Sequence, residues 1–417
     1  MKLLQVQVPD FRVLKDVDIK FDRRFVPNIF PLGSLNGGGK STLLQLVFVL
    51  LHCCTNPERK VFIKNLLHGF TLNDDSSDRV LAIIKVWDGE KEVEIKFIVC
   101  HNTYIETYIE NIIKQNNVEI KFPSYNRNYI DENSIKNLLF PDQNNKDSKL
   151  YQYLYSQYLP LEHIIYICPY FSGVGVGENH LLCKIGDNLD INKAEAWLDE
   201  ISNKIFLAAP ITQVFLFTSQ KSRSLLFQQN SERDYDLDLK SSKLKLPGFF
   251  TYDFAPVDLL IKVFTSARDE DFRTAIETEG KYGKRYEELL AELSLLLANK
   301  KVNISTDFSK ITFKLDTNNE NIELYPEDLS HGELKRLSIY MWLKYNKIED
   351  AIVLMDEIEI GFHPDWQYEI IRDLEEWSSS NQYILATHSY QLCRALTPAH
   401  VRELEPKLIK SDNNIPL

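Results

Sequence analysis

The stretch LSHGELKRLSIYMWLKYNKIEDAIVLMDEIEIGFHP, residues 329–364, predicts a helix followed by a short buried strand. Its opening Ser-x-Gly-Glu suits a helix start, and the apolar residues after it recur with the period of an amphipathic helix. The apolar run 351–355 then ends on two adjacent acids, Asp356 and Glu357. Because two carboxylates at the end of a buried strand are costly, we expect a cation and a water molecule to interact with them.

A glycine-rich segment more than three hundred residues before Asp356 predicts a site for phosphates that would accompany this cation. Residues 34–42, SLNGGGKST, follow the apolar run 28–32 and lead into a buried helix predicted over 42–53. A strand, a glycine-rich turn and a helix in this order are typical of a Walker A phosphate loop. The loop departs from the usual pattern at one position, where Ser34 replaces the first glycine.

This loop predicts ATP and Mg²⁺ as cofactors. Its glycines let successive backbone N–H groups point at phosphate oxygens, and the following helix adds the partial positive charge of its N-terminus. Lys40 is expected to reach the β- and γ-phosphates, while the Ser41 hydroxyl and Asp356 bind Mg²⁺. Glu357 is placed to polarise the attacking water. The predicted nucleotide-binding residues of the loop are Asn36, Gly37, Gly38, Gly39, Lys40, Ser41 and Thr42.

A second core strand, predicted over 382–386, ends in Thr387-His388-Ser389. An isolated histidine is more often a structural residue than a catalytic one. Because this histidine follows the strand after the two acids, we interpret His388 as a sensor of the γ-phosphate. Lys40, Glu357 and His388 are therefore the predicted catalytic residues.

Length and composition favour a cytoplasmic globular protein. The 417 residues suit one elaborated domain or two lobes, and the net charge of −12 argues against a protein that coats nucleic acid uniformly. Six scattered cysteines without a CxxC pair indicate a reducing compartment. The first residues alternate like a strand, unlike a signal peptide, and the longest apolar run, 43–51, is about half a membrane span. We expect no membrane partner.

The rest of the chain predicts a strand-rich beginning and a largely helical middle. Strand alternation is expected over 3–8, 17–21, 80–87, 92–100, 302–316 and 321–324, with a core strand over 163–171. Helices are expected over 191–206 and 256–268, and 269–299 is expected to form an antiparallel hairpin with its neighbours. Residues 111–149 predict exposed loops around one short helix, and 173–177 a flexible turn.

Four motifs taken together, SLNGGGKST, LSHGE, LMDEIEIGFHP and LATHS, resemble those of the ABC-type ATPase head in its SMC and OLD (overcoming-lysogenization-defect) branch, within the AAA-family P-loop ATPases. The resemblance covers the two ends of the chain. It implies an α/β fold, a P-loop ABC-ATPase head whose mixed β-sheet is flanked by helices, with an inserted, mainly helical lobe. The corresponding parts are an N-terminal ATPase lobe, 1–110, the inserted lobe, 111–320, and a C-terminal ATPase lobe, 321–417.

The same resemblance implies that the LSxGE segment acts on a second copy of the chain. In such ATPases it caps the nucleotide held by the partner's Walker A loop, so that a head-to-tail homodimer encloses two ATP molecules. Ser330 would supply a hydroxyl and Gly332 a close backbone approach, beside a helix N-terminus. An ordinary helix cap closed by Glu333 is the alternative. The resemblance also places Glu359 and His363 at the dimer interface.

A glutamine that contacts the metal is expected at the end of a further strand. Gln157 and Gln213 are the candidates, and a plain surface residue is the alternative for each. The 290 residues between Lys40 and Ser330 far exceed the spacing in transporter subunits. The 29 residues after His388 leave no room for the TOPRIM nuclease domain of OLD proteins. The chain thus resembles stand-alone ATPases of anti-phage operons such as Septu, whose effector is a separate nuclease.

Three functions remain open from the sequence. The first is an ATP-driven dimerising switch that regulates an effector, a nuclease encoded nearby, in bacterial anti-phage defence. The second is a DNA repair or recombination ATPase of the SMC type that binds DNA directly. The third is a nucleotide sensor with little hydrolysis, against which Glu357 argues. The candidate DNA contacts are Arg23 with Arg24, Lys221 with Arg223, and the lysines of 240–245, although such clusters are usually solvated surface.

Overall fold

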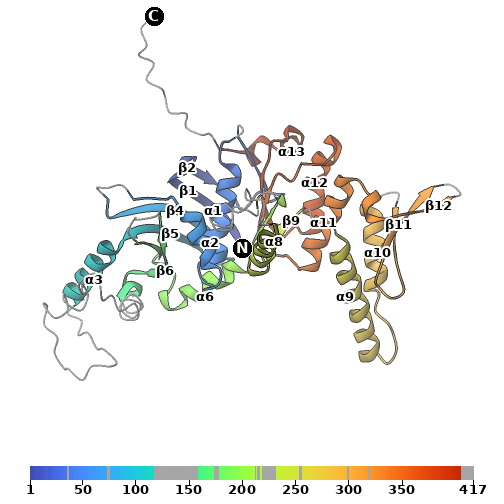
Figure 1. Ribbon diagram of the computed structural model, residues 1–417, viewed down its shortest axis with the longest axis horizontal. Coiled ribbons are helices and arrows are strands. Elements are labelled where there is room, and N and C mark those ends of the chain that lie inside the picture. Colours follow the sequence, from blue (N-terminus) through green and yellow to red (C-terminus); the bar gives the residue numbers. More distant parts are fainter. Residues whose placement is uncertain are drawn as a thin grey trace, which may run out of the picture.

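The computed structural model describes residues 1–34, 37–72, 76–116, 158–172, 178–211, 213, 217, 232–252, 256–297, 300–317 and 320–404. Two six-stranded sheets and a three-stranded sheet form the framework of these residues. Figure 1 shows the antiparallel six-stranded sheet at the left of the molecule, and the helices of the C-terminal segment and the small sheet at the right. The predicted α/β class is confirmed, with parallel and antiparallel strands in separate sheets.

One large sheet is parallel throughout, in the strand order β15-β3-β14-β13-β8-β9. Its strands are β3 (Ile29–Gly33), β8 (Ile205–Ala209), β9 (Phe249–Thr251), β13 (Ile352–Asp356), β14 (Gln382–Ala386) and β15 (Arg402–Glu403). The carboxyl ends of parallel strands share one edge of a sheet. The segments that follow β3, β13 and β14 therefore meet at that edge, although they come from opposite ends of the chain.

The other large sheet is antiparallel, in the order β2-β1-β4-β5-β7-β6. Its strands are β1 (Lys2–Phe11), β2 (Leu14–Lys20), β4 (Asp78–Trp87), β5 (Glu92–His101), β6 (Ile164–Phe171) and β7 (Glu178–Ile185). The strands predicted in the first hundred residues are confirmed. The strand predicted over 163–171 is also present, as the edge strand β6. Helix α3 (Asn102–Asn116) follows β5 directly.

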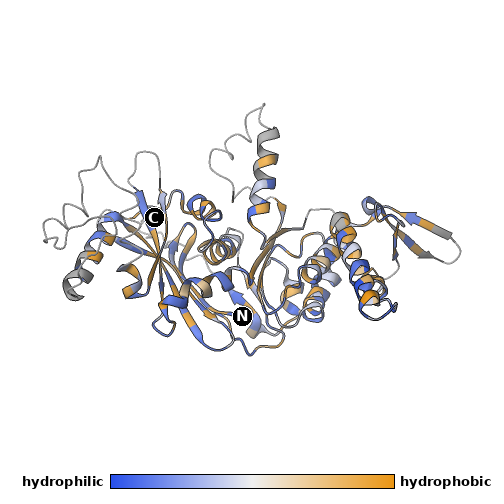
Figure 2. Ribbon diagram, turned by 90° about the horizontal axis from the view of Figure 1, so that it is seen from below, coloured by the Kyte–Doolittle hydropathy of each residue, from blue (hydrophilic) through white to orange (hydrophobic). Residues whose placement is uncertain are grey.

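Helix α1 (Lys40–Cys53) lies in the core that joins the two large sheets. Twelve of its residues are buried, including every residue from Leu43 to Cys53. They share one hydrophobic cluster with residues of β1, β4, β5 and β7 and with residues of the parallel strands β13 and β14. A helix enclosed on all sides needs apolar residues all round, which explains the predicted buried helix over 42–53. Figure 2 shows hydrophobic residues recurring along the strands of both sheets.

Strand β13 divides its side chains between two cores. Ile352 and Leu354 belong to the core that contains α1, whereas Val353 and Met355 belong to a second core on the opposite face of the sheet. The second core is closed by α11 (His331–Tyr345), α12 (Pro364–Trp377) and the short α13 (Tyr390–Arg394). A parallel strand covered by helices on both faces reads as a continuous apolar run, as this one does.

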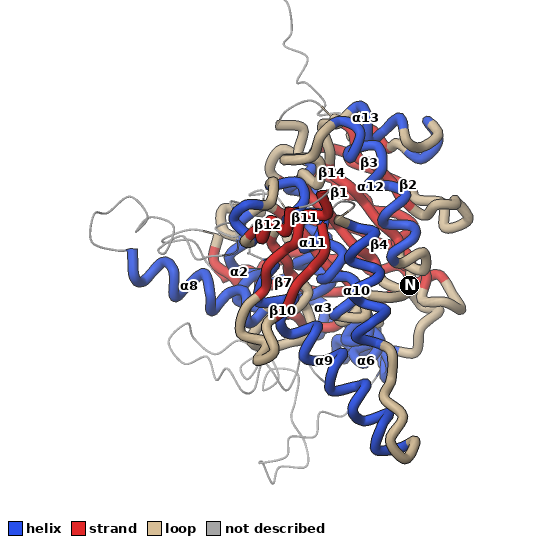
Figure 3. The backbone as a smooth tube through the Cα atoms, turned by 90° about the vertical axis from the view of Figure 1, so that its right-hand side faces the viewer, coloured by secondary structure: helices blue, strands red, loops and turns tan. Residues whose placement is uncertain are grey.

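A helical portion with the small sheet forms the right-hand end of the molecule in Figure 1. Helices α9 (Pro256–Glu277) and α10 (Arg285–Leu296) pack as the expected antiparallel hairpin and share a third core with α11 and β11. The small sheet consists of β10 (Lys300–Ile304), β11 (Ile311–Thr317) and β12 (Glu320–Leu324). Helix α8 (Glu232–Lys245) projects from the body (Figure 3). The remaining elements are α2 (Lys60–Leu67), α6 (Ile191–Ser202), and the 3-10 turns Leu159–Glu162, Pro326–Asp328 and Pro398–His400.

The helix predicted over 191–206 is too long at its end. Helix α6 stops at Ser202, and the N–H of Asn203 closes it by bonding carbonyls of the last turn. Residues 205–209 form β8 instead, a central strand of the parallel sheet. A five-residue apolar run does not distinguish a strand from a buried helix by periodicity, so the sequence pattern misassigned its first residues.

The expected insert, 111–320, does not stand apart from the two lobes as one unit. Strands β6 and β7 complete the antiparallel sheet, and β8 and β9 complete the parallel sheet. Helices α8, α9 and α10 keep the predicted helical character. The turn predicted over 173–177 lies outside the described residues. Of the range 111–149, predicted as loops around one short helix, residues 111–116 belong to α3 and the rest lies outside the described residues.

The Gln382 side chain joins the two large sheets. It is fully buried in β14, accepts a hydrogen bond from the Leu3 N–H at 2.6 Å, and donates one to the Leu3 carbonyl at 2.9 Å. Replacement Gln382→Leu leaves both backbone groups of Leu3 without this partner. We expect it to lower the free energy of unfolding by about 1–3 kcal/mol in urea titrations.

The matched control is Gln7→Leu, which removes an exposed hydrogen bond to Asp18 from the neighbouring strand pair. It should change the free energy of unfolding by less than about 0.5 kcal/mol. Equal effects of the two substitutions would contradict a special role of Gln382 in joining the sheets.

Candidate nucleotide-binding site

The glycine-rich turn between β3 and α1 has the backbone that a phosphate loop requires. Gly37 and Gly39 adopt left-handed conformations, with φ of 77° and 91°. A Cβ atom on Gly39 would lie 2.6 Å from Cδ2 of Leu14, so the packing also requires glycine here. Leu35 and the predicted site residue Asn36 lie outside the described residues.

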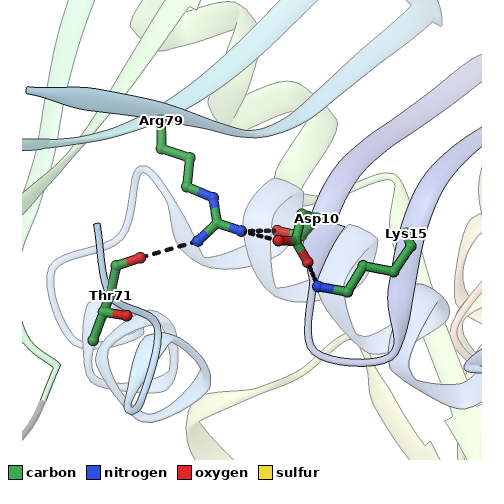
Figure 4. A network of polar contacts seen from close by, with 4 residues as sticks. All are labelled: Asp10, Lys15, Thr71 and Arg79. Carbon is green, nitrogen blue, oxygen red and sulfur yellow. Dashed lines mark hydrogen bonds and ion pairs between the residues drawn. The ribbon is translucent and has the colours of Figure 1, made fainter. Parts of the chain in front are cut away.

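The turn between β1 and β2 packs against this loop and is fixed by a polar network (Figure 4). Asp10 forms ion pairs with Lys15, across the hairpin, and with Arg79 of β4. Arg79 also donates a hydrogen bond of 3.0 Å to the carbonyl of Thr71. The network holds the hairpin in place beside Gly39.

Lys40 is buried at the start of α1, with 5% of its surface exposed. Its Nζ donates to the Ser34 hydroxyl at 3.0 Å and to the Ser34 carbonyl at 3.2 Å. Burial lowers the pKa of Lys40, and the nearby carboxylates of Asp356, Glu359 and Glu357 oppose this shift. The serine that replaces the usual glycine thus supplies an oxygen that holds the lysine over the loop.

Asp356 lies at the end of β13, in contact with the start of α1. Its Oδ1 accepts a hydrogen bond of 3.0 Å from the Ser41 hydroxyl, and only 2% of the residue is exposed. Its Oδ2 is buried without a hydrogen-bond partner among the described residues. Burial raises the pKa of Asp356 to about 7, against the opposing effects of the Ser41 hydrogen bond and Lys40. A cation beside this carboxyl group would favour its ionised form.

Ser41 and Asp356 fit a Mg²⁺ ion that arrives with a nucleotide. A hydroxyl and a carboxylate oxygen are ligands that Mg²⁺ prefers. The ion would also give Oδ2 of Asp356, which is buried without a partner among the described residues, a charge interaction. Across the described ranges, no group of three His, Cys, Asp or Glu side chains is arranged to hold a metal alone. Phosphate oxygens and water would therefore complete the shell, and the bound ion would neutralise charge that develops on the phosphates.

Glu357 follows Asp356 with a left-handed backbone, φ 51°, which is rare for a residue with a long side chain. Its N–H donates to the Ala386 carbonyl of β14 at 2.9 Å, and its carbonyl accepts from Nζ of Lys335 at 3.0 Å. These bonds turn the chain sharply after the strand and leave the half-buried glutamate beside Asp356.

Glu359 connects the loop after β13 with the loop after β14. One carboxylate oxygen accepts a hydrogen bond of 2.6 Å from the His388 N–H, and the other is buried without a partner in the described structure. Glu359 is 8% exposed, so its carboxylate contacts residues of its own chain. The His388 side chain is exposed next to this contact, and His363 is exposed at the N-terminus of α12.

The LSHGE segment forms a complete helix cap at the start of α11. The Ser330 hydroxyl accepts from the Glu333 N–H, and the Glu333 carboxylate accepts from the Ser330 N–H at 2.9 Å. The alternative interpretation of this motif, an ordinary cap, therefore describes its contacts within the chain. Gly332 is buried, and a Cβ atom there would lie 2.9 Å from the Gly361 carbonyl oxygen.

Of the two glutamine candidates, Gln213 lies just beyond β8, the strand next to β13. Its side-chain carbonyl accepts a hydrogen bond of 2.7 Å from Gln45. Gln45 is the polar residue that interrupts the apolar run of α1, and it is buried. Gln157 lies outside the described residues.

Comparison with known proteins agrees with this geometry. Residues 217–394 match the family model described as "AAA domain, putative AbiEii toxin, Type IV TA system". The match contains the segments that carry Ser330, Asp356, Glu357 and His388, and the phosphate loop with Lys40 lies before it. This segment, less than half of the chain, is thus similar to a domain of the AAA class. The assignment drawn from the four motifs is confirmed at this level.

Two curated relatives align with short parts of the chain. The "Retron Ec83 probable ATPase" of Escherichia coli is 33% identical over 92 residues, which are 19% of this chain and 17% of the relative. The "Retron Vc95 probable ATPase" of Vibrio cholerae serotype O1 biovar El Tor is 38% identical over 52 residues, 12% of this chain and 10% of the relative. The alignments thus span less than a fifth of either relative's length.

Among solved structures, the SMC head domain from Thermotoga maritima superposes with a TM-score of 0.43 and 9% sequence identity, over 97% of this chain and 94% of that one. In the helices of the described residues, none is long and apolar enough to cross a membrane.

The structure brings together most of the residues predicted for the site. Lys40, Ser41, Asp356 and Glu357 converge at one edge of the parallel sheet, and His388 is linked to them through Glu359. No contact joins Ser330 to this cluster among the described interactions. Sequence reasoning identified neither Lys335 nor Gln45 as part of the site. Gln45 had an available signal, because it is a polar residue inside the apolar run 43–51, whereas Lys335 had none.

The raised pKa of Asp356 predicts a pH dependence of stability in the metal-free chain. Its folded-state pKa of about 7 lies above the unfolded value near 3.8, so the folded chain binds the proton more tightly. Wild-type stability should therefore fall as pH rises from about 4 through 7, relative to Asp356→Asn, by up to roughly 4 kcal/mol. Urea unfolding in EDTA at pH 4 and pH 8 measures this difference.

Exposed Asp350→Asn, in the loop before β13, is the control and should show no such trend. A constant stability difference between wild type and Asp356→Asn across this pH range would show that Asp356 stays ionised in the folded chain.

Proposed function

We propose that the chain binds ATP with Mg²⁺ and hydrolyses it to ADP and phosphate. The observation that carries this proposal is the contact between the Ser41 hydroxyl and Asp356, whose second oxygen is buried without a partner. A phosphate loop and a buried carboxylate in contact are the two halves of a Mg²⁺–nucleotide site. A cation bound there would provide that second oxygen with a partner.

Each residue of the cluster has a distinct role in this proposal. Lys40 would exchange its Ser34 contacts for phosphate oxygens, since its charge is already desolvated beside the loop. Glu357 would accept a proton from, or orient, the attacking water. His388 would contact the γ-phosphate from the exposed end of β14, and Gln213 would approach the metal from the end of β8.

We further propose that Ser330 and Gly332 act on the nucleotide of a second copy, in a head-to-tail dimer that encloses two ATP molecules. Two observations support this role. Ser330 is exposed at the N-terminus of the 15-residue helix α11, where partial positive charge attracts a phosphate. It also makes no described contact with the cluster of its own chain.

The names of the relatives support a role in defence. The matched family is described by a toxin of a type IV toxin–antitoxin system, and both curated relatives are named as ATPases of retrons. We propose that this chain, like an ATPase component of such systems, regulates a separate effector, a nuclease, in response to infection. Copurification of a tagged chain with its neighbouring gene products tests this part.

Direct DNA binding, the function of a repair ATPase, gains no support from the basic clusters. The Arg23 guanidinium stacks 3.5 Å from the centre of the Trp87 ring, and Arg24 pairs with Asp22. Lys243 of α8 donates to the Thr251 hydroxyl at 2.5 Å. The pair Lys221 and Arg223 lies outside the described residues.

Replacement Glu357→Gln should trap an ATP-bound dimer without turnover. The amide keeps the size of the side chain but cannot accept a proton from water, so ATP binds and is not cleaved. We expect ATPase activity to fall at least about a hundredfold. Light scattering after gel filtration with Mg²⁺–ATP should show a dimer for this variant and a monomer without nucleotide.

Two further variants in the Glu357→Gln background separate the parts of this proposal. Lys40→Ala should abolish ATP binding, while Ser330→Arg should leave ATP binding intact and prevent dimerisation. An ATP-loaded Glu357→Gln chain that stays monomeric would rule out the sandwich dimer and leave the hydrolysis proposal standing. Turnover in Glu357→Gln equal to wild type would rule out the role of Glu357.

A further inference from the structure

Lys335 is a buried lysine one turn into α11 and bonds the loop that carries Glu357. It is 7% exposed, and its Nζ donates to the carbonyls of Glu357 and Ile360, each at 3.0 Å. The ammonium group also lies 4.0 Å from the ring centre of Tyr252 and 5.5 Å from that of Phe362. Carbonyl dipoles and aromatic faces stabilise a desolvated cation.

The loop held by Lys335 is a tight turn whose first residue is the proposed catalytic base. Glu357 has a φ of 51°, a left-handed conformation that is strained for a residue with a side chain and persists only where its surroundings fix it. Its N–H is fixed by Ala386 and its carbonyl by Lys335. Within the turn, the Ile360 N–H bonds the Glu357 carbonyl at 3.3 Å and the Phe362 N–H bonds Glu359 at 3.0 Å.

A second contact ties the same helix to the same loop. The start of α11 meets the loop where Gly332 faces Gly361, so closely that a Cβ atom on Gly332 would lie 2.9 Å from the Gly361 carbonyl oxygen. Helix α11 therefore contacts the loop at two points one helical turn apart, Gly332 and Lys335. A shift of the helix start must displace the loop or break these contacts.

We infer that Lys335 is a positioning residue that fixes the backbone of Glu357 and couples it to the signature segment at the start of α11. The inference rests on the proposed function and deepens it. When Ser330 binds the nucleotide of a second copy, this contact fixes the position of the α11 N-terminus. Because Lys335 bonds the Glu357 turn from the same helix, the position of that turn is then fixed as well. The base is then oriented for water only when the second nucleotide is in place.

Replacement Lys335→Met keeps the aliphatic stem of the side chain and removes the N–H donors. The turn loses the bond to the Glu357 carbonyl, so the carboxylate is no longer held for the attacking water. We expect kcat to fall about tenfold or more, with KM for ATP within about twofold of wild type. In the Glu357→Gln background the same substitution should cause little further loss, because the group it positions is already absent.

Lys344→Met, an exposed lysine at the far end of α11, is the matched control and should keep wild-type kcat. Lys335→Gln is measured as a second variant, in case Lys335→Met does not unfold cooperatively. Its amide keeps a polar group at this position but reaches fewer carbonyls than the lysine. Lys335→Gln should also lower kcat, by a smaller factor than Lys335→Met. Either folded variant with wild-type kcat, or with kcat and ATP binding lost in parallel, overturns the inference.

The wild-type chain and Glu357→Gln separate this inference from the function on which it rests. If neither hydrolyses ATP, the proposed function fails. If both hydrolyse ATP alike, the role of Glu357 fails and the inference about Lys335 fails with it. If wild type turns over, Glu357→Gln does not, and Lys335→Met matches wild type, only the role of Lys335 fails.

Discussion

The hydrogen bond between the Ser41 hydroxyl and Asp356 is the contact on which the site depends. It joins residues 315 positions apart, one at the start of α1 and one at the end of β13. The fold makes it by placing α1 between the two large sheets, with β13 in contact with that helix. The carboxylate is desolvated as a consequence, and a desolvated carboxylate with a free oxygen has a strong preference for a cation.

The turn after β13 is the second organising feature, because three segments meet on it. Glu357 bonds Ala386 at the end of β14, Glu359 bonds the backbone of His388, and Lys335 bonds Glu357 from α11. The strained backbone of Glu357 thus connects the acids, the histidine segment and the signature helix. Each of these bonds is short, so a small shift of one segment must move the others or break a bond.

The sequence predicted the elements whose signal is local. The phosphate loop, α1 and β13 were predictable because a glycine-rich turn or a pair of acids borders a continuous apolar run, and β14 was predictable from its own apolar run. Strand β8 was not, since five apolar residues after a helix do not reveal a parallel partner 147 positions away (Ile205 and Ile352). The contribution of β6 and β7 to the antiparallel sheet is likewise set by pairing with distant strands.

The site itself was predictable in its motif residues but not in their supports. A lysine on an amphipathic helix is usually solvated, and Lys335 is buried where the loop 357–362 and the Tyr252 ring pack against it. Gln45 could be noticed as a polar residue in an apolar helix, yet its partner Gln213 follows a strand that the pattern missed. Contacts between segments that are distant in the sequence do not produce a periodic pattern of apolar residues, so a single sequence does not predict them.

The central claim is that Ser41 and Asp356 hold a divalent cation together with nucleotide phosphates. Electron paramagnetic resonance of Mn²⁺, titrated into the chain with and without ATP, tests this most directly. We predict Mn²⁺ binding that requires ATP, shows coupling to phosphorus nuclei, and is lost in Asp356→Ala but not in Asp350→Ala. ATP-dependent Mn²⁺ binding that survives in Asp356→Ala, or tight Mn²⁺ binding without ATP, would contradict the account.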